Sequence, residues 1–311
     1  MNDTIYVRAF AKINIGLKVG PRNQDGYHSI ESIFQAVDLG DDLQISVSKG
    51  KGLEVRADLG CAPEQTTVYA AASAFLAKTK LECGISIEVF KRIPSMAGMG
   101  GGSADAAGTL AGLDMLLGTG FGAEGLLAIG EAVGSDVPFF LSGGTAFVEG
   151  RGEIVHTILP RIDLSFLLVK PLFGVSTPWA YKRLDDFRAA RGLDPSRIPS
   201  GESPDSALRS LERPPETWEF ANDFQAPLID AFPEYSFILE GLKVLGASYV
   251  SLTGSGSAVY AVFRGRDACM AKGKAKALMA GTSTPNTLSG MGLHALKPLE
   301  TSLVLSYYPF R

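Results

Sequence analysis

The sequence predicts an α+β fold of two domains. Segments with the alternating pattern of β-strands and segments with the spacing of α-helices follow one another in mixed order, without an internal repeat. The chain has 311 residues, more than the roughly 100 to 200 residues of a typical domain. We therefore expect one domain over residues 1–160, a second over residues 161–311, and a cleft between them.

The composition is typical of a soluble globular enzyme. Hydrophobic residues make up 46% of the chain and charged residues 20%, and the net charge of -4 lacks the basic excess of a nucleic-acid-binding surface. The three cysteines are widely spaced and form no CxxC pair, which argues against a disulfide framework and a zinc site. The first residues lack the pattern of a signal peptide, and no apolar run approaches the ~18 residues of a membrane span. We expect a cytoplasmic protein without nucleic-acid or membrane partners.

Strands dominate the start of the chain. Residues 5–47 have the pattern of a strand meander, with turns expected at residues 23–26 and 40–42, where Asp and Gly adjoin. The other elements expected before residue 160 are a helix over 68–80, a strand over 85–90, helices over 103–117 and 123–132, and hairpin strands over 145–149 and 153–158.

The second half alternates strands and helices around a polar stretch. Residues 185–216 are rich in Pro, Ser and Arg, which predicts a mobile loop or the boundary between the lobes. The other elements expected here are a strand over 164–169, a helix over 228–245 broken near Pro233, strands over 248–252 and 258–264, a helix over 268–279, and a last strand over 303–308.

A glycine-rich stretch, "PSMAGMGGGSADAA", precedes the helix expected at Ser103. Bare backbone at a helix N-terminus lets amide groups and the helix dipole approach an anion, and phosphate is the usual occupant. No Lys follows the glycines as in a P-loop, and Ser103 stands where the dinucleotide fingerprint needs its third glycine. The glycines alone also allow a flexible turn with Ser103 as an ordinary N-cap.

Three segments in this order resemble the GHMP kinases, named for galactokinase, homoserine kinase, mevalonate kinase and phosphomevalonate kinase. They are "AFAKINIGLKVGPRNQDGYHSIESIFQAVDL", the glycine-rich stretch, and "VSLTGSGSAVYAVF". The resemblance implies a two-lobed fold with mixed and antiparallel sheets, an active site in the interdomain cleft, and ATP whose Mg²⁺ is held mainly through phosphate oxygens, without a dedicated metal site in the protein. It assigns ATP binding to Pro94, Gly98, Gly100, Gly101, Gly102, Ser103 and Ala104, and a second glycine-rich loop to Thr253, Gly254, Ser255 and Gly256.

Lys12 lies in a strand whose apolar residues share the opposite face. The pattern alone favours a solvated lysine on an open face. The resemblance instead makes Lys12 the catalytic lysine and Asn14 a substrate contact beside it.

Asp136 follows Gly134 and Ser135 and precedes an apolar segment that contains Pro138. From the sequence, N-capping of a short helix is as good an interpretation as catalysis. The resemblance makes Asp136 the catalytic aspartate, which orients the attacking hydroxyl group and accepts its proton late in the reaction.

Tyr27 and His28 follow an Asp-Gly turn, where exposed polar aromatic residues are common. This Gly-Tyr-His block resembles one branch of the family, whose small-molecule substrate carries a cytidine diphosphate group. The branch assigns Tyr27 and Tyr181 to stacking on the cytosine and His28 to hydrogen bonds with it. Trp179 is the alternative to Tyr181, whose other interpretation is ordinary helix packing.

One pair departs from the family pattern: Thr66 and Thr67 stand where many relatives carry the Asn-Leu pair that helps to hold the adenine. His156 and His294 match no motif, and we expect them to be structural. Two other functions stay open, a kinase of this fold for a mevalonate-like or polyol alcohol and a non-catalytic nucleotide sensor. We expect a monomer or a weak homodimer.

Overall fold

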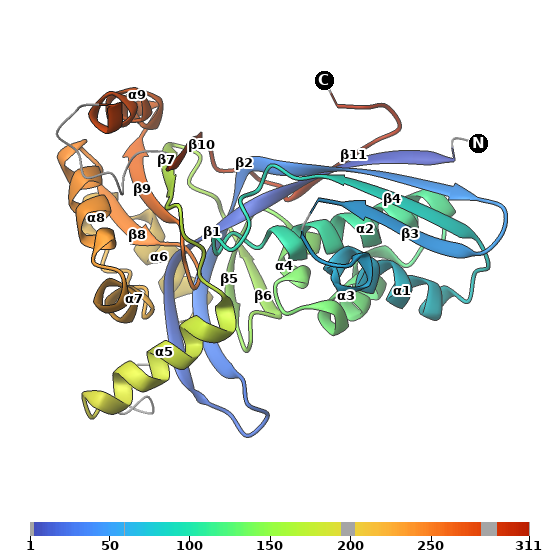
Figure 1. Ribbon diagram of the computed structural model, residues 1–311, viewed down its shortest axis with the longest axis horizontal. Helices are drawn as coiled ribbons and strands as arrows, with labels where there is room; N and C mark the ends of the chain where they lie inside the picture. The colour runs from blue at the N-terminus through green and yellow to red at the C-terminus, as the bar shows by residue number, and fades with distance from the viewer. Residues whose placement is uncertain (1–2, 59, 194–202, 281–290, 311) are drawn as a thin grey trace.

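Two β-sheets organise the chain in its computed structural model, which describes residues 3–58, 60–193, 203–280 and 291–310 (Figure 1). The first sheet has seven strands and the second has four. Neighbouring strands are antiparallel, except that β3 and β4 run parallel. The expected α+β class with mixed and antiparallel sheets is confirmed.

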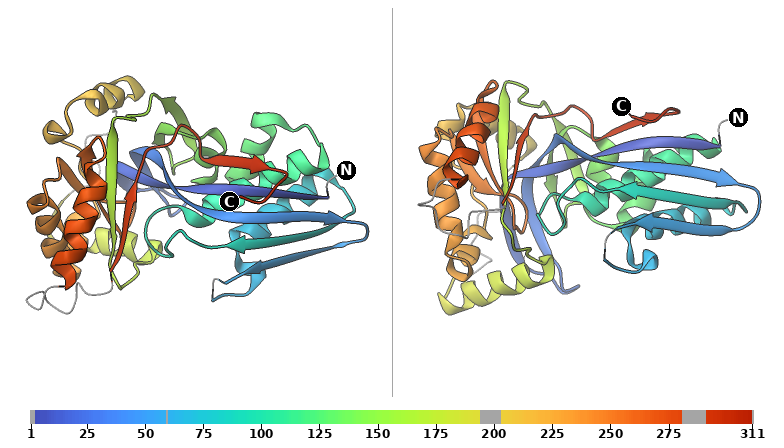
Figure 2. Two further views of the ribbon diagram at one scale, coloured as in Figure 1. Left: turned by 90° about the horizontal axis from the view of Figure 1, so that it is seen from above. Right: turned by 45° about the horizontal axis from the view of Figure 1, so that its top comes forward.

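The first sheet is covered on one face by helices. Its strands are β11 (Leu303–Ser306), β1 (Thr4–Arg22), β2 (His28–Ser48), β4 (Gly84–Phe90) and β3 (Gly52–Ala57), with β5 (Thr145–Glu149) and β6 (Ile154–Ile158) attached to β2. The helices of this part are η1 (Pro63–Gln65), α1 (Thr67–Thr79), α2 (Gly101–Leu117), α3 (Gly122–Val133) and α4 (Val137–Ser142). Helix α2 lies against β1 and β2, which places its N-terminus beside the strand of Lys12 (Figures 1 and 2).

The second sheet lies at the other end of the molecule (Figure 2). Its strand order is β10 (Gly292–Leu296), β7 (Leu164–Lys170), β9 (Val259–Arg264) and β8 (Tyr249–Leu252). Around it lie α5 (Thr177–Ala190), α6 (Pro204–Glu212), η3 (Pro215–Thr217), α7 (Gln225–Ala231), α8 (Glu234–Val244) and α9 (Asp267–Ala280). Strand β11 then returns to the first sheet and pairs with β1. The domain boundary at residue 160 remains our proposal.

The turn expected at residues 40–42 is wrong. Strand β2 continues through these residues, and Gly40 faces Phe10 of β1. The irregularity is a bulge, because the register shifts between Phe10 and Lys12 while Val37 bridges to Pro298. A Cβ atom on Gly40 would lie 2.8 Å from the carbonyl oxygen of Ala9, so the glycine permits close strand pairing here.

Of the two interpretations of residues 185–216, the mobile loop is wrong in part. Helix α5 continues to Ala190 and α6 begins at Pro204, while residues 194–202 lie outside the described residues. The buried stripe of α5 consists of Ala180, Leu184 and Arg188, and the charge of Arg188 conceals the helical pattern. The Nη2 atom of Arg188 donates to the carbonyl oxygen of Val19 at 2.8 Å and to Asp223 Oδ2 at 2.9 Å, which joins α5 to β1.

Two short strands, β3 and β10, had no counterpart in the prediction. The break near Pro233 is confirmed, because α7 ends at Ala231 and Pro233 occupies the N-cap position of α8. Proline suits the start of a helix because its missing N–H would have no partner there.

Candidate active site

A cavity of about 1170 Å³ brings most of the expected site residues together. Its walls come from β1, the tip of the β1–β2 hairpin, the glycine-rich stretch, α5 and the loop before β9. The expected residues that line it are Lys12, Asn14, Tyr27, His28, Pro94, Gly98, Gly100, Gly101, Gly102, Ser103, Asp136, Tyr181, Gly254 and Ser255. Ala104, Thr253 and Gly256 are buried behind the wall.

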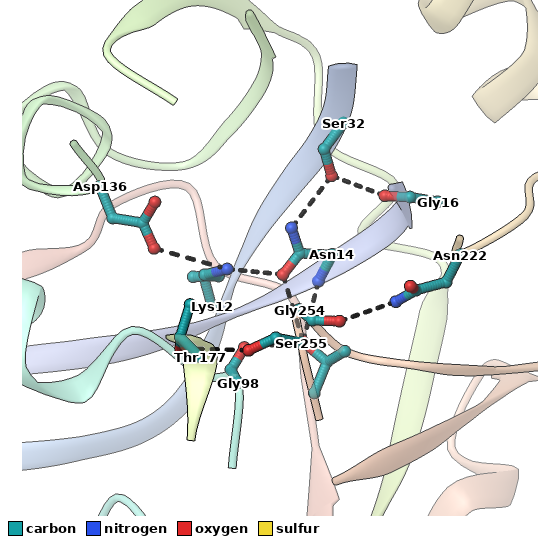
Figure 3. A network of polar contacts seen from close by, with 11 residues as sticks. Lys12, Asn14, Gly16, Ser32, Gly98, Asp136, Thr177, Asn222, Gly254 and Ser255 are labelled. Carbon is teal, nitrogen blue, oxygen red and sulfur yellow. Dashed lines mark hydrogen bonds and ion pairs between the residues drawn. The ribbon is translucent and has the colours of Figure 1, made fainter. Parts of the chain in front are cut away.

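Lys12 is buried, with an exposed fraction of 4%, so it is not the solvated lysine that the pattern alone favours. Its Nζ atom donates to Asn14 Oδ1 at 2.5 Å and lies 3.6 Å from Asp136 Oδ2 (Figure 3). The same atom lies 4.1 Å from the centre of the Phe34 ring. Burial lowers the pKa of the Lys12 ammonium group, and the Asp136 carboxylate opposes this shift. The charged form of Lys12 therefore depends on the nearby acceptor atoms of Asn14 and Asp136.

Hydrogen bonds fix the orientation of Asn14 beside Lys12 (Figure 3). The Nδ2 atom of Asn14 donates to Ser32 Oγ at 3.0 Å, and Ser32 Oγ donates to the carbonyl oxygen of Gly16 at 2.6 Å. The backbone N–H of Asn14 donates to Thr253 Oγ1 at 3.1 Å. The Oδ1 atom is thus held toward Lys12 by β2 and by a loop from the second sheet.

Asp136 stands at the N-cap position of α4, but its side chain makes no capping hydrogen bond. The carboxylate is directed toward Lys12 instead (Figure 3). Pro138 in the first turn lacks an N–H group and so needs no cap. Of the two interpretations of Asp136, N-capping and catalysis, the geometry favours catalysis, because the carboxylate faces Lys12 in the cavity.

Helix α2 begins two residues earlier than expected, so the interpretation of Ser103 as N-cap is wrong. Gly100 is the N-cap, with a φ of 70° and no side-chain cap, and Ser103 lies in the first turn. Only glycine adopts this left-handed conformation without strain. The first amide groups of α2 therefore have no side-chain acceptor from the cap, and the residues of this turn line the cavity.

The two glycine-rich loops pack backbone against backbone. Gly98 has a φ of 72°, and a Cβ atom there would lie 2.1 Å from the carbonyl oxygen of Thr253. A Cβ atom on Gly254 would lie 2.7 Å from the carbonyl oxygen of Gly98. The hydroxyl group of Thr253 donates to that same Gly98 oxygen at 3.1 Å. The second loop thus supports the first from the side of the second sheet.

A buried charge cluster, which we did not anticipate, lies beneath the first turn of α2. Lys91 Nζ donates to Asp41 and, at 2.6 Å, to Asp105 Oδ2, while Asp41 Oδ1 also accepts from the backbone N–H of Arg92 and Ile93. Burial raises the pKa of Asp105 to about 7. An acid on the buried face of an alanine-rich helix was the available signal in the sequence.

Asp105→Asn is expected to flatten the pH dependence of the free energy of unfolding between about pH 4 and 7. Because burial raises the pKa of Asp105 to about 7, the folded protein keeps a proton that the unfolded chain has lost, so wild-type stability falls as pH rises through this window. The variant should remove a slope of up to about 1.4 kcal/mol per pH unit, measured by urea unfolding.

The matched control for Asp105 is Glu216→Gln, which removes a carboxylate from an exposed ion pair with Arg264. It should leave the wild-type slope in place. Equal slopes in wild type and Asp105→Asn would show that Asp105 does not hold a proton in the folded state.

The far end of the cavity is aromatic. His28 is buried and stacks on Tyr181, with ring centres 5.0 Å apart. Tyr27 is 58% exposed, and the guanidinium of Arg151 lies 5.2 Å from the centre of its ring. Trp179 packs near Phe232 and does not line the cavity.

Asp185 belongs to this end of the cavity and was missed by sequence reasoning. Its Oδ1 atom lies 3.0 Å from His28 Nε2. Asp185 follows Tyr181 by four residues on α5, so both side chains lie on one face of the helix. That spacing was the available signal, but residue 185 begins the polar stretch whose composition predicts a loop or a lobe boundary.

Thr66 and Thr67, which depart from the family pattern, line the part of the cavity near the start of α2 and have structural roles there. Thr66 Oγ1 caps α1 by accepting from the backbone N–H of Tyr69 at 3.1 Å. Thr67 Oγ1 donates to the carbonyl oxygen of Gly102 at 2.6 Å, which ties the start of α1 to the first turn of α2.

Two other kinds of feature are absent from the part of the chain that the structure describes. No group of three or more His, Cys, Asp or Glu side chains there could hold a metal ion. No helix in those same ranges has the length and apolar character needed to span a membrane. His156 pairs with Glu149 at 2.9 Å, and His294 lies in strand β10, both outside the cavity.

Comparisons with known proteins match both parts of the chain to one family. Residues 66–144 match the GHMP kinases N terminal domain, and residues 207–280 match the GHMP kinases C terminal domain. The chain is 35% identical to the 4-diphosphocytidyl-2-C-methyl-D-erythritol kinase of Geobacter metallireducens, over 84% of this chain and 89% of that protein. It is 37% identical to the enzyme of the same name from Moorella thermoacetica, over 84% of this chain and 90% of that protein.

Solved structures show the same fold. A crystal structure of 4-(cytidine 5'-diphospho)-2C-methyl-D-erythritol kinase superposes with a TM-score of 0.72 at 30% identity, over 94% of this chain and 99% of that one. Homoserine kinase from Cytophaga hutchinsonii, at 20% identity and a TM-score of 0.67 over 98% of both chains, shares the fold. The resemblance seen in the sequence is confirmed, and the chain belongs to the GHMP kinase family of small-molecule kinases.

Proposed function

We propose that the protein transfers the γ-phosphoryl group of ATP to the 2-hydroxyl of 4-diphosphocytidyl-2-C-methyl-D-erythritol, giving the 2-phosphate and ADP. The names of its relatives support this substrate and imply a role in non-mevalonate isoprenoid precursor biosynthesis. The observation that carries the proposal is the Lys12–Asp136 pair, which lies between the start of α2 and the His28–Tyr181 pair. Lys12 Cε lies 3.2 Å from the place that a Cβ atom on Gly100 would take, and all of these residues line one cavity. Burial and, to a lesser extent, the Asp136 carboxylate raise the pKa of Tyr181.

The first turn of α2 is the proposed site for the ATP phosphates. Its backbone N–H groups and the positive end of the helix dipole favour an anion. Gly100, Gly101 and Gly102 let the phosphates approach the backbone, and Ser103 adds a hydroxyl group. Bound Mg²⁺ supplies neutralisation of phosphate charge, mainly through the phosphate oxygens.

Asp136 and Lys12 are the proposed catalytic residues. The Asp136 carboxylate accepts a hydrogen bond from the attacking hydroxyl group and so orients it. It takes the proton late, as the loose transition state of phosphoryl transfer permits. Lys12, whose Nζ atom lies 3.6 Å from Asp136 Oδ2, stabilises negative charge on the carboxylate and on the transferring group. Alignment and charge stabilisation supply most of the rate, because a carboxylate is a weak base toward an alcohol.

The aromatic end is the proposed site for the cytidine. Tyr181→Leu is expected to raise the KM for the cytidine substrate by about tenfold, because an aromatic–base stack contributes about 1–3 kcal/mol. Trp179→Leu serves as the matched control, since Trp179 lies two residues before Tyr181 on the same helix, on a different face and outside the cavity. Steady-state kinetics with both variants decide between the two rings. A larger effect at Trp179 would contradict the assignment.

The test of the function is an ADP-release assay with ATP, Mg²⁺ and the diphosphocytidyl substrate. Turnover is expected with this substrate and not with mevalonate or simple polyols. His28→Ala should weaken binding of the cytidine substrate selectively. Absence of ADP release, with a control kinase active in the same assay, would refute the proposed function. Equal activity of His28→Ala and wild type would favour a kinase for another alcohol.

We also infer a cytoplasmic enzyme, because its co-substrate is ATP and Cys61, Cys83 and Cys269 are all free thiols. A monomer or weak homodimer remains our expectation, which sedimentation velocity measures directly.

A further inference from the structure

The carboxylate of Asp185 contacts His28 from helix α5, and both residues line the cavity. Its Oδ1 atom is 3.0 Å from His28 Nε2. The His28 side chain has an exposed fraction of 5%, and that of Asp185 has 37%. The pair thus joins a buried imidazole in the cavity wall to a carboxylate that is partly open to water.

Helix α5 holds this carboxylate in place without help from a ligand. Tyr181, one turn before Asp185, stacks on the His28 ring and meets the Phe224 ring edge-on at 4.9 Å. Arg188, one turn after it, is buried and bonds to Val19 and Asp223. Tertiary contacts therefore anchor the helix one turn before and one turn after Asp185.

The chemistry of this contact assigns the proton of the imidazole. An ionised carboxylate only accepts hydrogen bonds, so Nε2 of His28 must carry the hydrogen. In a neutral imidazole the other nitrogen, Nδ1, is then an acceptor. Within the described ranges no residue forms a hydrogen bond with Nδ1 of His28. This nitrogen is also not one of the fully enclosed polar atoms without a partner, so it is accessible from the cavity. An acceptor atom is thus left for whatever occupies the cavity beside His28.

We propose that Asp185 is a specificity-determining residue that fixes His28 as the Nε2–H tautomer, so that Nδ1 accepts from the 4-amino group of cytosine and rejects the 4-carbonyl of uracil. This inference rests on the proposed function, because it requires a pyrimidine beside His28. Asp185 acts through His28 and is a positioning residue, without contact to the reacting atoms.

Loss of the carboxylate frees the choice of tautomer. Without Asp185, His28 can carry its hydrogen on Nδ1 and donate to the 4-carbonyl of a uridine substrate. A site whose polar atom matches one partner rejects the other strongly, because the mismatch leaves a buried group unpaired. Asp185 is therefore expected to widen the difference between cytidine and uridine substrates.

The first measurement is the tautomer of His28 by ¹⁵N NMR of the wild-type protein at pH 7. The chain has three histidines, so His28→Gln identifies the signal directly. A neutral ring with hydrogen on Nε2 is the expected result. A ring with hydrogen on Nδ1, or a doubly protonated ring, overturns the proposal, and this holds whether or not any Asp185 variant folds.

The second measurement is the ratio of kcat/KM for the diphosphocytidyl substrate to that for its uridine counterpart. Asp185→Ala should reduce this ratio by about 10- to 100-fold, mainly through KM, and Asp185→Glu should restore part of it. A purely structural role would lower activity on both substrates together and leave the ratio unchanged, which would refute the inference.

Glu149→Ala is the matched control. Glu149 holds His156 through a carboxylate–imidazole contact of 2.9 Å on strands β5 and β6, outside the cavity. It should change the His156 signal while the His28 signal and the substrate ratio stay as in wild type. Failure of the proposed function is distinguishable, because wild type would then not turn over the cytidine substrate at all. An unchanged ratio with an active wild type refutes only the role of Asp185.

Discussion

Asp136→Asn is expected to lower kcat by about 10²- to 10⁴-fold, the range that a positioned acid–base group contributes. The amide keeps the shape of the side chain but removes the negative charge that faces Lys12 at 3.6 Å. It can no longer accept the hydroxyl proton, and Lys12 loses the partner that counteracts the effect of burial on its pKa. Because the cavity walls stay intact, ATP binding should be retained.

Single-turnover assays and calorimetric titration with a non-hydrolysable ATP analogue measure the two quantities separately. Asp163→Asn is the matched control, since Asp163 forms its ion pair with Arg161 away from the cavity. Loss of turnover with ATP binding retained supports catalysis by Asp136. Equal, trace activity in both variants and in wild type would instead favour the nucleotide sensor.

Gly98→Ala is expected to destabilise the protein by about 3 kcal/mol or more, through strain and overpacking together. The left-handed φ of 72° disfavours any side chain, and the new Cβ atom would lie 2.1 Å from the Thr253 carbonyl oxygen. This neighbour is backbone and belongs to the other glycine-rich loop, so relief requires the loops to separate. Affinity for ATP should fall as well, because the separation displaces the chain that leads into α2.

Gly118→Ala separates the two causes. Gly118 is the C-cap of helix α2 and has a φ of 60°, but a Cβ atom there would meet no heavy atom within 4 Å. It should lose only about 1 to 2 kcal/mol from the left-handed conformation. Urea unfolding measures both variants. If Gly98→Ala proved as stable as Gly118→Ala, the packing of the two loops would not contribute to stability.

The motif residues could be predicted from the sequence, but the reasons for their positions could not. Strand alternation put Lys12 and Asn14 on one face, and alone it suggested an open face. Lys12 is buried beside Phe34 and Gly100, and Asn14 is buried beside Thr253. Contacts so distant in the chain leave no local pattern.

Similar limits explain the errors elsewhere in the chain. The Asp-Gly chemistry of residues 40–42 resembles a turn, but Gly40 serves a bulge within one long strand. Asp185 was hidden because the buried stripe of α5 includes Arg188, whose partners Val19 and Asp223 lie elsewhere in the fold. In each case a tertiary contact overrode the local signal.

Strand β11 has a consequence for the way the protein folds. It pairs Leu303 with Ala9, so part of the outer edge of the strand that carries Lys12 is covered by a segment far along the chain. Until these two segments meet, Tyr6 to Ala9 lack their backbone partners on this edge, and open strand edges recruit other chains. Because the pairing closes a very long loop, we expect this edge to form late in folding.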